Sequence, residues 1–535
     1  MQMPISNTLA SILVLIITIG CEYRSENASD ARLGEIKFEF SADEKARPHF
    51  TEGLLLLHSF EYQDARESFL KAQKLDPRCM MAFWGEAMTY NHSLWRGQNY
   101  DKGQVAIQKF VSGKKKKMGG DFSELEKDLF RSVEILYGEG NKFDRDKQYA
   151  DFMGQLYEKH PGSHEVAAFY ALSLLGSVPV GRDEEVYGKG AVIAQGILKE
   201  NPDHPGALHY LIHSYDDPDH AHLALQAANS YSRVAPDAGH ALHMPSHIYI
   251  ALGMWDEVIA SNVASWEASL KRKEQKGLSN NDLNYHAYHW LSYGYLQKEE
   301  TDRSGDMVRQ MADYTKDNPS RSARSYLIDM KATFLVASDM WHDPIANIAT
   351  KTEDLNISSQ ALYDFAEGVK AFYGRDSEKI DSLILTMVYK RQNAGTSLTE
   401  EGIPMCSGGV SGAQANKLDI EQAEVMEREM RGLRSWMNRD TFQTEKWFQK
   451  AVELESTLSY SYGPPEVAKP AHELYGEWLL ETGRYDDAIA QFDLILDRAP
   501  KRLRAMRKKL EAARLAGKDV MVGELEEMIG MSNNE

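Results

Sequence analysis

Small, aromatic and proline residues recur along the chain at the spacings expected of paired helices. The first copy, where successive intervals are 12, four, three and five positions, is Gly53, Ala65, Phe69, Ala72 and Pro77. The second copy, near the other end, with intervals of 12, four and eight, is Gly476, Ala488, Phe492 and Pro500. Small residues let two antiparallel helices approach to about 8–10 Å, an aromatic ring fills the wedge beside the crossing, and proline ends the second helix. The pattern therefore predicts helix pairs within residues 49–77 and 476–500.

This spacing resembles the tetratricopeptide repeat family, whose unit of about 34 residues has small residues at positions 8, 20 and 27, an aromatic residue at 24 and proline at 32. Pro202 and Pro236 lie 34 residues apart, with Ala224 at position 20 between them. Further matches to the unit are Gly253, Trp255, Gly368, Ile380, Ile384, Gly432, Phe448 and Ala451. The resemblance covers most of residues 45–515. It implies an all-α, right-handed α-solenoid of helix-turn-helix repeats, each of which buries its apolar face against its neighbours.

Strand signals are scarce, since no run of alternating β-branched residues is long enough to predict a sheet. We expect the solenoid to have an N-terminal part over residues 45–310 and a C-terminal part over residues 311–530. Residues 21–44 are largely polar and are expected to form a tether before the repeats.

The N-terminus has the pattern of an export signal. Leu9 to Ile19 is an uncharged apolar run of 11 residues, too short to span a bilayer but typical of the core of a signal peptide. Thr18-Ile19-Gly20-Cys21 resembles the lipobox of bacterial lipoproteins, which implies that residues 1–20 are removed and that Cys21 is lipidated. The protein would then be exported and lipid-anchored, at the bacterial outer membrane or in the periplasm. Conventional signal cleavage after Gly20 is the alternative, and it exports the protein too.

Composition narrows the classes of partner. The chain has 61 Lys and Arg against 80 Asp and Glu, a formal net charge of −19, which repels nucleic-acid phosphates and anionic lipid headgroups. We therefore expect no nucleic-acid partner, and membrane contact only through the lipid anchor. The cysteines are Cys21, Cys79 and Cys406, too few for a disulfide framework.

Histidine is concentrated in one segment. Of 17 histidines, ten lie between His204 and His289. His209 and His213 are followed 34 residues later by His243 and His247, so one pair of positions is repeated across one unit. Residues three or four apart share a helix face, and each pair can therefore present two imidazoles to one point.

The family resemblance places these residues on the concave groove, whose lining comes from positions 2, 5, 9, 12 and 13 of each first helix. His209, His243 and His289 fall at position 5, and His213 and His247 at position 9. His240 and His286 fall at position 2, with Asp216 and Asp217 at positions 12 and 13. Bacterial exported tetratricopeptide-repeat proteins resemble this His-rich segment, and that similarity implies a fold and export but no reaction.

Three interpretations of the cluster remain open from the sequence. The histidines could hold neighbouring helices in register, recognise an anionic ligand, or bind a metal. The metal hypothesis has His209, His213, His243, His247 and His289 as ligands, with His240, His286, Asp216 and Asp217 as supporting or ligand-binding residues. Imidazole ligands suit zinc, copper, iron or nickel, and ligand type does not distinguish them.

Two further features bear on this hypothesis. Pro245 lies inside the second histidine pair, so that helix is expected either to kink or to begin near Met244. Glu473 and Glu477 take positions 5 and 9 of the C-terminal repeat. We expect them either to act as ligand or acid–base groups or to form a separate polar patch on the groove.

Two functions are compatible with the sequence. One is an exported repeat scaffold whose groove holds a peptide, protein or small molecule and binds a transition metal. The other is a metal-dependent enzyme, a hydrolase or oxidoreductase, that uses the histidines. An enclosed aromatic lining beside the histidines would favour a small-molecule pocket. An open, even groove would favour a protein partner.

Overall fold

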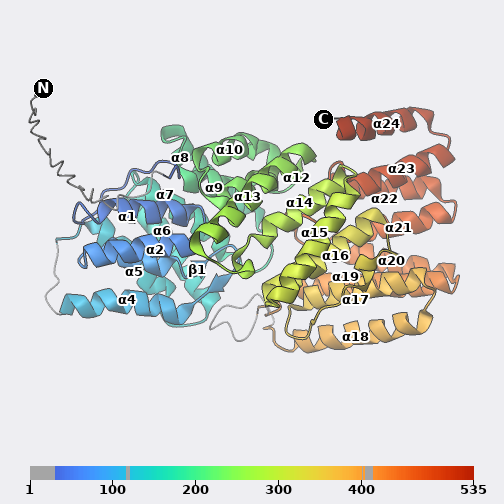
Figure 1. Cartoon of the computed structure of the whole chain (residues 1–535), viewed down its shortest axis with the longest axis horizontal. Coiled ribbons are helices and arrows are strands. Elements are labelled where there is room, and N and C mark those ends of the chain that lie inside the picture. The colour runs from blue at the N-terminus through green and yellow to red at the C-terminus, as the bar shows by residue number, and fades with distance from the viewer. Residues whose placement is uncertain (1–30, 116–120, 400–401, 404–413, 535) are drawn as a thin grey trace, which may run out of the picture.

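The computed structural model describes residues 31–115, 121–399, 402–403 and 414–534, and it is an elongated stack of paired antiparallel helices. Figure 1 shows the pairs following one another along the long axis, from α1–α9 at one end to α17–α24 at the other. The predicted all-α solenoid of tetratricopeptide-like repeats is confirmed. Residues 1–30, including Cys21 and the expected signal peptide, lie outside the described residues, as does Cys406.

The elements of the first half are α1 (Arg47–His58), α2 (Tyr62–Leu75), α3 (Met80–Met88), β1 (Asn91–His92), β2 (Gly97–Gln98), α4 (Tyr100–Lys115), α5 (Glu124–Leu136), α6 (Lys142–Lys159), α7 (His164–Ser177), α8 (Glu184–Glu200), α9 (Pro205–Ser214), α10 (Ala221–Val234), α11 (Gly239–His243), α12 (Pro245–Ala251) and α13 (Trp255–Lys276). Those of the second half are η1 (Asn280–Asp282), α14 (Tyr285–Gln297), α15 (Thr301–Asp317), α16 (Arg321–Ser338), η2 (Pro344–Asn347), α17 (Ile357–Tyr373), α18 (Ser377–Gly395), α19 (Lys417–Met437), α20 (Thr441–Glu455), α21 (Ala471–Glu481), α22 (Tyr485–Arg498), α23 (Leu503–Leu515) and α24 (Asp519–Asn534). The strands β1 and β2 form one short antiparallel hairpin. Among the described residues, no helix is long and apolar enough to cross a membrane.

The glycine and aromatic positions found in the sequence meet in the structure. A Cβ atom added at Gly53 would lie 2.8 Å from the ring of Phe69, and one at Gly476 would lie 2.7 Å from the ring of Phe492. Glycine therefore lets the ring of the second helix rest directly on the backbone of the first. This close approach is the reason that the spacing of the repeats is readable from sequence.

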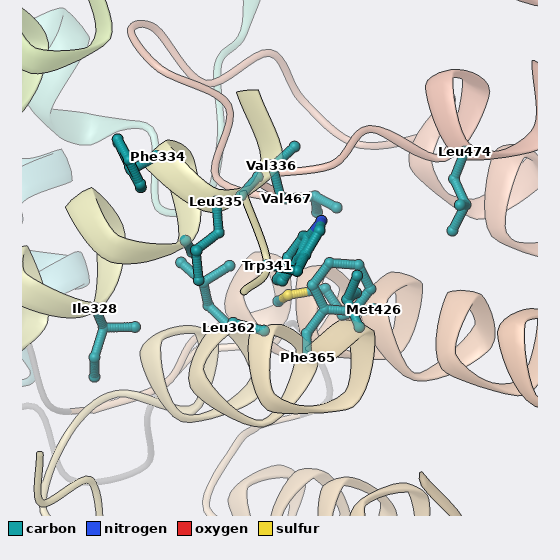
Figure 2. Packing of buried hydrophobic residues seen from close by; sticks show 14 of the residues in the cluster. Ile328, Phe334, Leu335, Val336, Trp341, Leu362, Phe365, Met426, Val467 and Leu474 are labelled. Atoms are coloured by element: carbon teal, nitrogen blue, oxygen red, sulfur yellow. The ribbon is translucent and has the colours of Figure 1, made fainter. Parts of the chain in front are cut away.

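The apolar core continues from one repeat to the next. In the second half, Trp341 follows α16, Phe365 lies on α17 and Met426 on α19, and all three belong to one buried cluster with Val467. Figure 2 shows Trp341 beside Phe365 and Met426, with Val467 above them. Segments distant in sequence thus share a single core, as a stacked solenoid requires.

Two segments leave the regular stack and cover the groove. The turn after α1 brings Phe60 against His209 on α9, with ring centroids 4.2 Å apart. The segment between α20 and α21 returns to the first half, where Ser459 Oγ accepts a hydrogen bond of 2.9 Å from the backbone N–H of Arg182. The same segment places Tyr462 4.7 Å from His247 between ring centroids. The two segments consequently cover part of the groove over the histidines.

We predict that Gly476→Ala lowers the free energy of unfolding by about 1–3 kcal/mol, because the new methyl group overpacks against Phe492. The loss should be smaller in a Phe492→Leu background, where the ring is gone, as measured by urea unfolding followed by circular dichroism. Gly188→Ala, on α8, is the matched control, since its Cβ would meet nothing within 4 Å. That control should be neutral or stabilising by about 0.5–1 kcal/mol. Equal effects at the two positions would contradict the packing account.

Candidate functional site

The central histidines lie on α9, α11, α12 and α14. His209 and His213 are one turn apart on α9. Proline cannot donate to the preceding turn, so α11 ends at His243 and α12 begins at Pro245, which confirms the interruption expected from the sequence. His243 and His247 remain neighbours across the break, with their Nε2 atoms 3.2 Å apart.

Six histidines form two adjacent groups of three. His209, His213 and His240 are the first trio, and His243, His247 and His286 are the second trio. Within each trio, one ring nitrogen of every residue lies within 4.8 Å of the others. The trios touch where the rings of His213 and His247 are 5.0 Å apart between centroids. We call the space that the six rings enclose the histidine chamber.

The chamber is largely buried, with His240 and His286 partly exposed, and of the two alternatives left open by the sequence it is closer to the enclosed one. His209 and His243 are 0% exposed, and His247 is 1% exposed. Phe60 covers the first trio, while Trp290 and Tyr462 lie 4.6 and 4.7 Å from His247 between ring centroids. Phe60 and Tyr462 come from distant parts of the chain, which is why helix periodicity did not predict the burial.

Hydrogen bonds to Nδ1 set the tautomer of three of these rings. His209 Nδ1 donates to the backbone carbonyl of His58 at 2.7 Å. His213 Nδ1 and His247 Nδ1 both donate to Asp216 Oδ2, at 3.2 and 3.1 Å. A carbonyl or carboxylate oxygen can only accept, so in each neutral ring the proton is on Nδ1 and Nε2 keeps its lone pair.

Asn262 sets the tautomer of His243 in the same way. The Nδ2 group of Asn262 donates to the Val258 carbonyl at 2.7 Å, so the amide oxygen is the atom that faces the ring. This Oδ1 accepts from His243 Nδ1 at 2.7 Å. His243 Nε2 therefore also carries a lone pair.

Asp216 is held as an anion by Arg182. The guanidinium pairs with Asp216 and, at 3.1 Å, with Asp217. Burial opposes ionisation of Asp216, but Arg182 and the two imidazoles hold the pKa of its carboxyl below the usual value. The carboxylate can thus accept from both trios at once.

Lone pairs consequently converge inside the chamber. Two lone pairs 3.2 Å apart at His243 and His247 repel unless a cation lies between them. Burial, strengthened for His243 by His286, lowers the pKa of both imidazoles, to about 4 for His247. The separation matches two nitrogens on one tetrahedral ion, which at about 2.0–2.1 Å from the metal would be about 3.3 Å apart.

Other residues expected at the site have further polar partners. His289 Nε2 is 3.2 Å from the hydroxyl of Thr333, and the residue belongs to neither trio. His286 Nδ1 is 3.3 Å from the Tyr326 hydroxyl. Asp217 pairs with Arg182 and with His220 Nδ1, at 2.8 Å, and contacts no histidine of the two trios among the described residues.

Glu473 and Glu477 form a separate buried ion-pair network, which is one of the two expectations stated for them. Arg502 Nε donates to Glu473 at 2.6 Å, and Arg504 Nε donates to Glu477 at 2.8 Å. Lys469 completes the network, 2.6 Å from Glu477. Both carboxylates are therefore neutralised by cations of the C-terminal repeats.

A second His/Glu group supports the chamber. His58 Nε2 lies 2.7 Å from Glu165, and its Nδ1 lies 2.9 Å from the Tyr210 hydroxyl, so both ring nitrogens are occupied. His204 is the third member of the group. This buried cluster ties α1 to α7 and α9, and it fixes the His58 carbonyl that orients His209.

A cavity of about 440 Å³ adjoins the chamber. Its wall includes His213 of the first trio, His286 of the second trio and the ring of Trp290. Asp329 and Glu466 also line it, and neither forms an ion pair among the described residues. Burial, with Asp419 nearby, raises the pKa of Glu466 to about 7, and burial beside Glu466 raises that of Asp329. A ligand in this cavity would meet imidazoles and protonatable carboxyls, together with the side chains of Arg96 and Arg182.

Sequence reasoning missed several residues that shape the site. Asn262, Arg182 and Tyr462 carry no local signal of their role. Asn262 bonds to a histidine 19 positions away, Arg182 pairs with an aspartate 34 positions away, and Tyr462 packs on a histidine of a distant repeat. The carbonyl of His58 that orients His209 is a backbone group, so no residue type in the sequence could have indicated its role.

Comparisons with known proteins add little beyond the fold. No protein-family model matches the chain, and no curated protein matches it. Among solved structures, yeast Tom70 is similar at 10% identity and a TM-score of 0.31, covering 90% of this chain and 92% of that chain. The APC/C hetero-tetramer Cut9-Hcn1 is similar at 11% identity and a TM-score of 0.38, covering 88% of this chain and 77% of that chain. The human IFIT1 dimer with m7Gppp-AAAA is similar at 11% identity and a TM-score of 0.33, covering 93% of this chain and 90% of that chain. Similarity this low carries no argument about function.

Proposed function

We propose that this chain is a repeat scaffold that binds a transition metal at the second trio and a small ligand in the adjoining cavity. The observation that carries the proposal is the pair of facing Nε2 atoms of His243 and His247, 3.2 Å apart. Both rings are oriented by acceptors at Nδ1, the arrangement that metal-binding histidines usually have. His286 supplies the third nitrogen.

The tautomers favour a metal over the other interpretations of the cluster. An anionic ligand needs N–H donors, yet the donors of His209, His213, His243 and His247 are used outside the chamber. Histidines that only hold helices in register would satisfy both ring nitrogens, as His58 does. Inward lone pairs on neutral rings are what a cation requires. Zinc, copper, iron and nickel all suit these ligands.

Enclosure favours a small ligand over a peptide or protein in this part of the groove. The segment between α20 and α21 closes the chamber, and the adjoining cavity of about 440 Å³ has the size of a small-molecule pocket. Asp329 and Glu466 would recognise a ligand with hydrogen-bond donors or an amine.

The cavity also favours a metal-dependent enzyme as the second candidate function. Three imidazoles leave a tetrahedral ion one open position, as in catalytic rather than structural zinc sites. His286 and Trp290 both line the cavity, so a substrate there would lie beside that position. The carboxyls of Glu466 and Asp329 are protonatable groups that could serve acid–base chemistry.

We expect the tag-free protein to retain Co(II) or Zn(II) after dialysis, and a His243→Gln/His247→Gln double variant to lose the ion from the second trio. The glutamines keep similar volume while removing both facing nitrogens. Elemental analysis and the visible absorption of the Co(II) form are the measurements. A spectral change on adding azide would reveal an open position and support the enzymatic candidate, while an unchanged spectrum would favour a closed, structural ion.

His222→Gln is the matched control, because this exposed histidine of α10 belongs to neither trio. It should bind as much metal as the wild type. Metal retention in the double variant equal to that of the control, or a wild type that holds no metal after reconstitution, would contradict the proposal.

We further propose export with lipid attachment at Cys21, supported by the apolar run and the Gly20-Cys21 junction. Expressed in a Gram-negative bacterium, the wild type should fractionate with membranes and incorporate labelled palmitate, and Cys21→Ser should be released into the soluble fraction unlabelled. Identical fractionation and labelling of the two forms would contradict lipidation. Export without label in the wild type would indicate conventional cleavage.

A further inference from the structure

We infer that the first trio, His209, His213 and His240, is a second metal site, so that the histidine chamber holds two ions side by side. This inference rests on the proposed function of the second trio. Its evidence comes from different atoms, and each site can therefore be tested alone.

The first trio is a set of buried ring nitrogens without partners. Among the described residues, the Nε2 atoms of His209, His213 and His240 are buried and form no hydrogen bond. His209 and His213 are 0% and 5% exposed, and their Nδ1 protons are used outside the chamber. A buried polar atom left unpaired costs about 1–3 kcal/mol. Three such atoms at one point are explained by a cation that accepts all three lone pairs.

Aromatic side chains cover the first trio. Phe60 lies over it, with ring centroids 4.2 Å from His209 and 5.7 Å from His240. Phe60 has a φ of 56°, a left-handed conformation that bulky residues rarely adopt. Glu299, Arg375 and Arg439 share this conformation at the turns inside other helix pairs, so it belongs to the repeat turn, and at this turn it places an aromatic ring over the trio.

Asp216 links the two trios. One oxygen of this carboxylate accepts from His213 in the first trio and from His247 in the second. The rings of His240 and His243 are also in contact, 5.9 Å apart between centroids. Shared orientation by one carboxylate gives His213 and His247 the same tautomer and turns their lone pairs toward a common space.

The cavity gives a ligand access to both ions. His213 and His286, one from each trio, line it together. Two dications in neutral imidazole sites repel each other, and an oxygen-donor ligand between them would offset that repulsion. The ligand class that fits is therefore a small molecule with an oxygen donor at one end and hydrogen-bond donors facing Asp329 and Glu466.

The experiment measures stoichiometry and coupling in the full chain. After Zn(II) loading and dialysis against a weak chelator, we expect about two equivalents in the wild type and in His222→Gln, and about one in His209→Gln or His243→Gln. In the Cu(II) form, electron paramagnetic resonance should show a signal broadened or weakened by coupling in the wild type. Either single-trio variant should give the sharp signal of an isolated ion.

The outcomes separate the two proposals. One equivalent in the wild type that survives His209→Gln and is lost in His243→Gln would overturn the second ion and leave the proposed function standing. No metal in the wild type would overturn both. Circular dichroism must show that each variant is folded, and His240→Asn, at a partly exposed position of the first trio, provides a second variant that should also leave about one equivalent.

Discussion

Acceptors outside the histidine chamber determine which nitrogen of each imidazole faces inward. A neutral imidazole has one donor and one acceptor, so a ring that donates outward at Nδ1 must turn a lone pair inward at Nε2. The acceptors are the His58 carbonyl, Asp216 and the amide oxygen of Asn262, which belong to α1, the end of α9 and α13. Arg182 keeps Asp216 ionised, and Val258 fixes the amide orientation. If these acceptors moved, the rings could rotate and satisfy one another, and the proposed metal sites would lose their inward lone pairs.

The solenoid supplies this constraint because it brings distant repeats together. The first repeat folds back on α9 through His58, Glu165 and Tyr210, which places Phe60 over the first trio. The segment between α20 and α21 approaches from the other end and places Tyr462 over the second trio. The low dielectric of the closed chamber strengthens the preference for neutral rings, since burial lowers the pKa of His209, His240, His243 and His286. Enclosure and tautomer thus favour the same ligand, a desolvated metal ion.

Local spacing explains why the fold was predictable. The 16-residue separation of Gly53 from Phe69, and of Gly476 from Phe492, is a contact within one repeat, and the break at Pro245 follows from one residue. The repeated positions of His209 and His243 likewise identified the candidate site. Their partition into two trios, their burial and their tautomers depend on contacts between repeats, which periodicity does not encode. His289 shows the limit of the register argument, because it occupies the same position as His209 and His243 but turns toward Thr333. Glu473 has the equivalent position too, and there the guanidinium of Arg502 is the cation that the side chain binds.

Anomalous X-ray diffraction from crystals of the Zn(II)-loaded protein, recorded on both sides of the zinc absorption edge, tests the central claim most directly. The account predicts a peak inside the histidine chamber about 2.0–2.1 Å from Nε2 of His243 and His247, with Asp216 and Asn262 still bound to the opposite nitrogens. Zinc found only at exposed histidines such as His222, with an empty chamber at full loading, would contradict it.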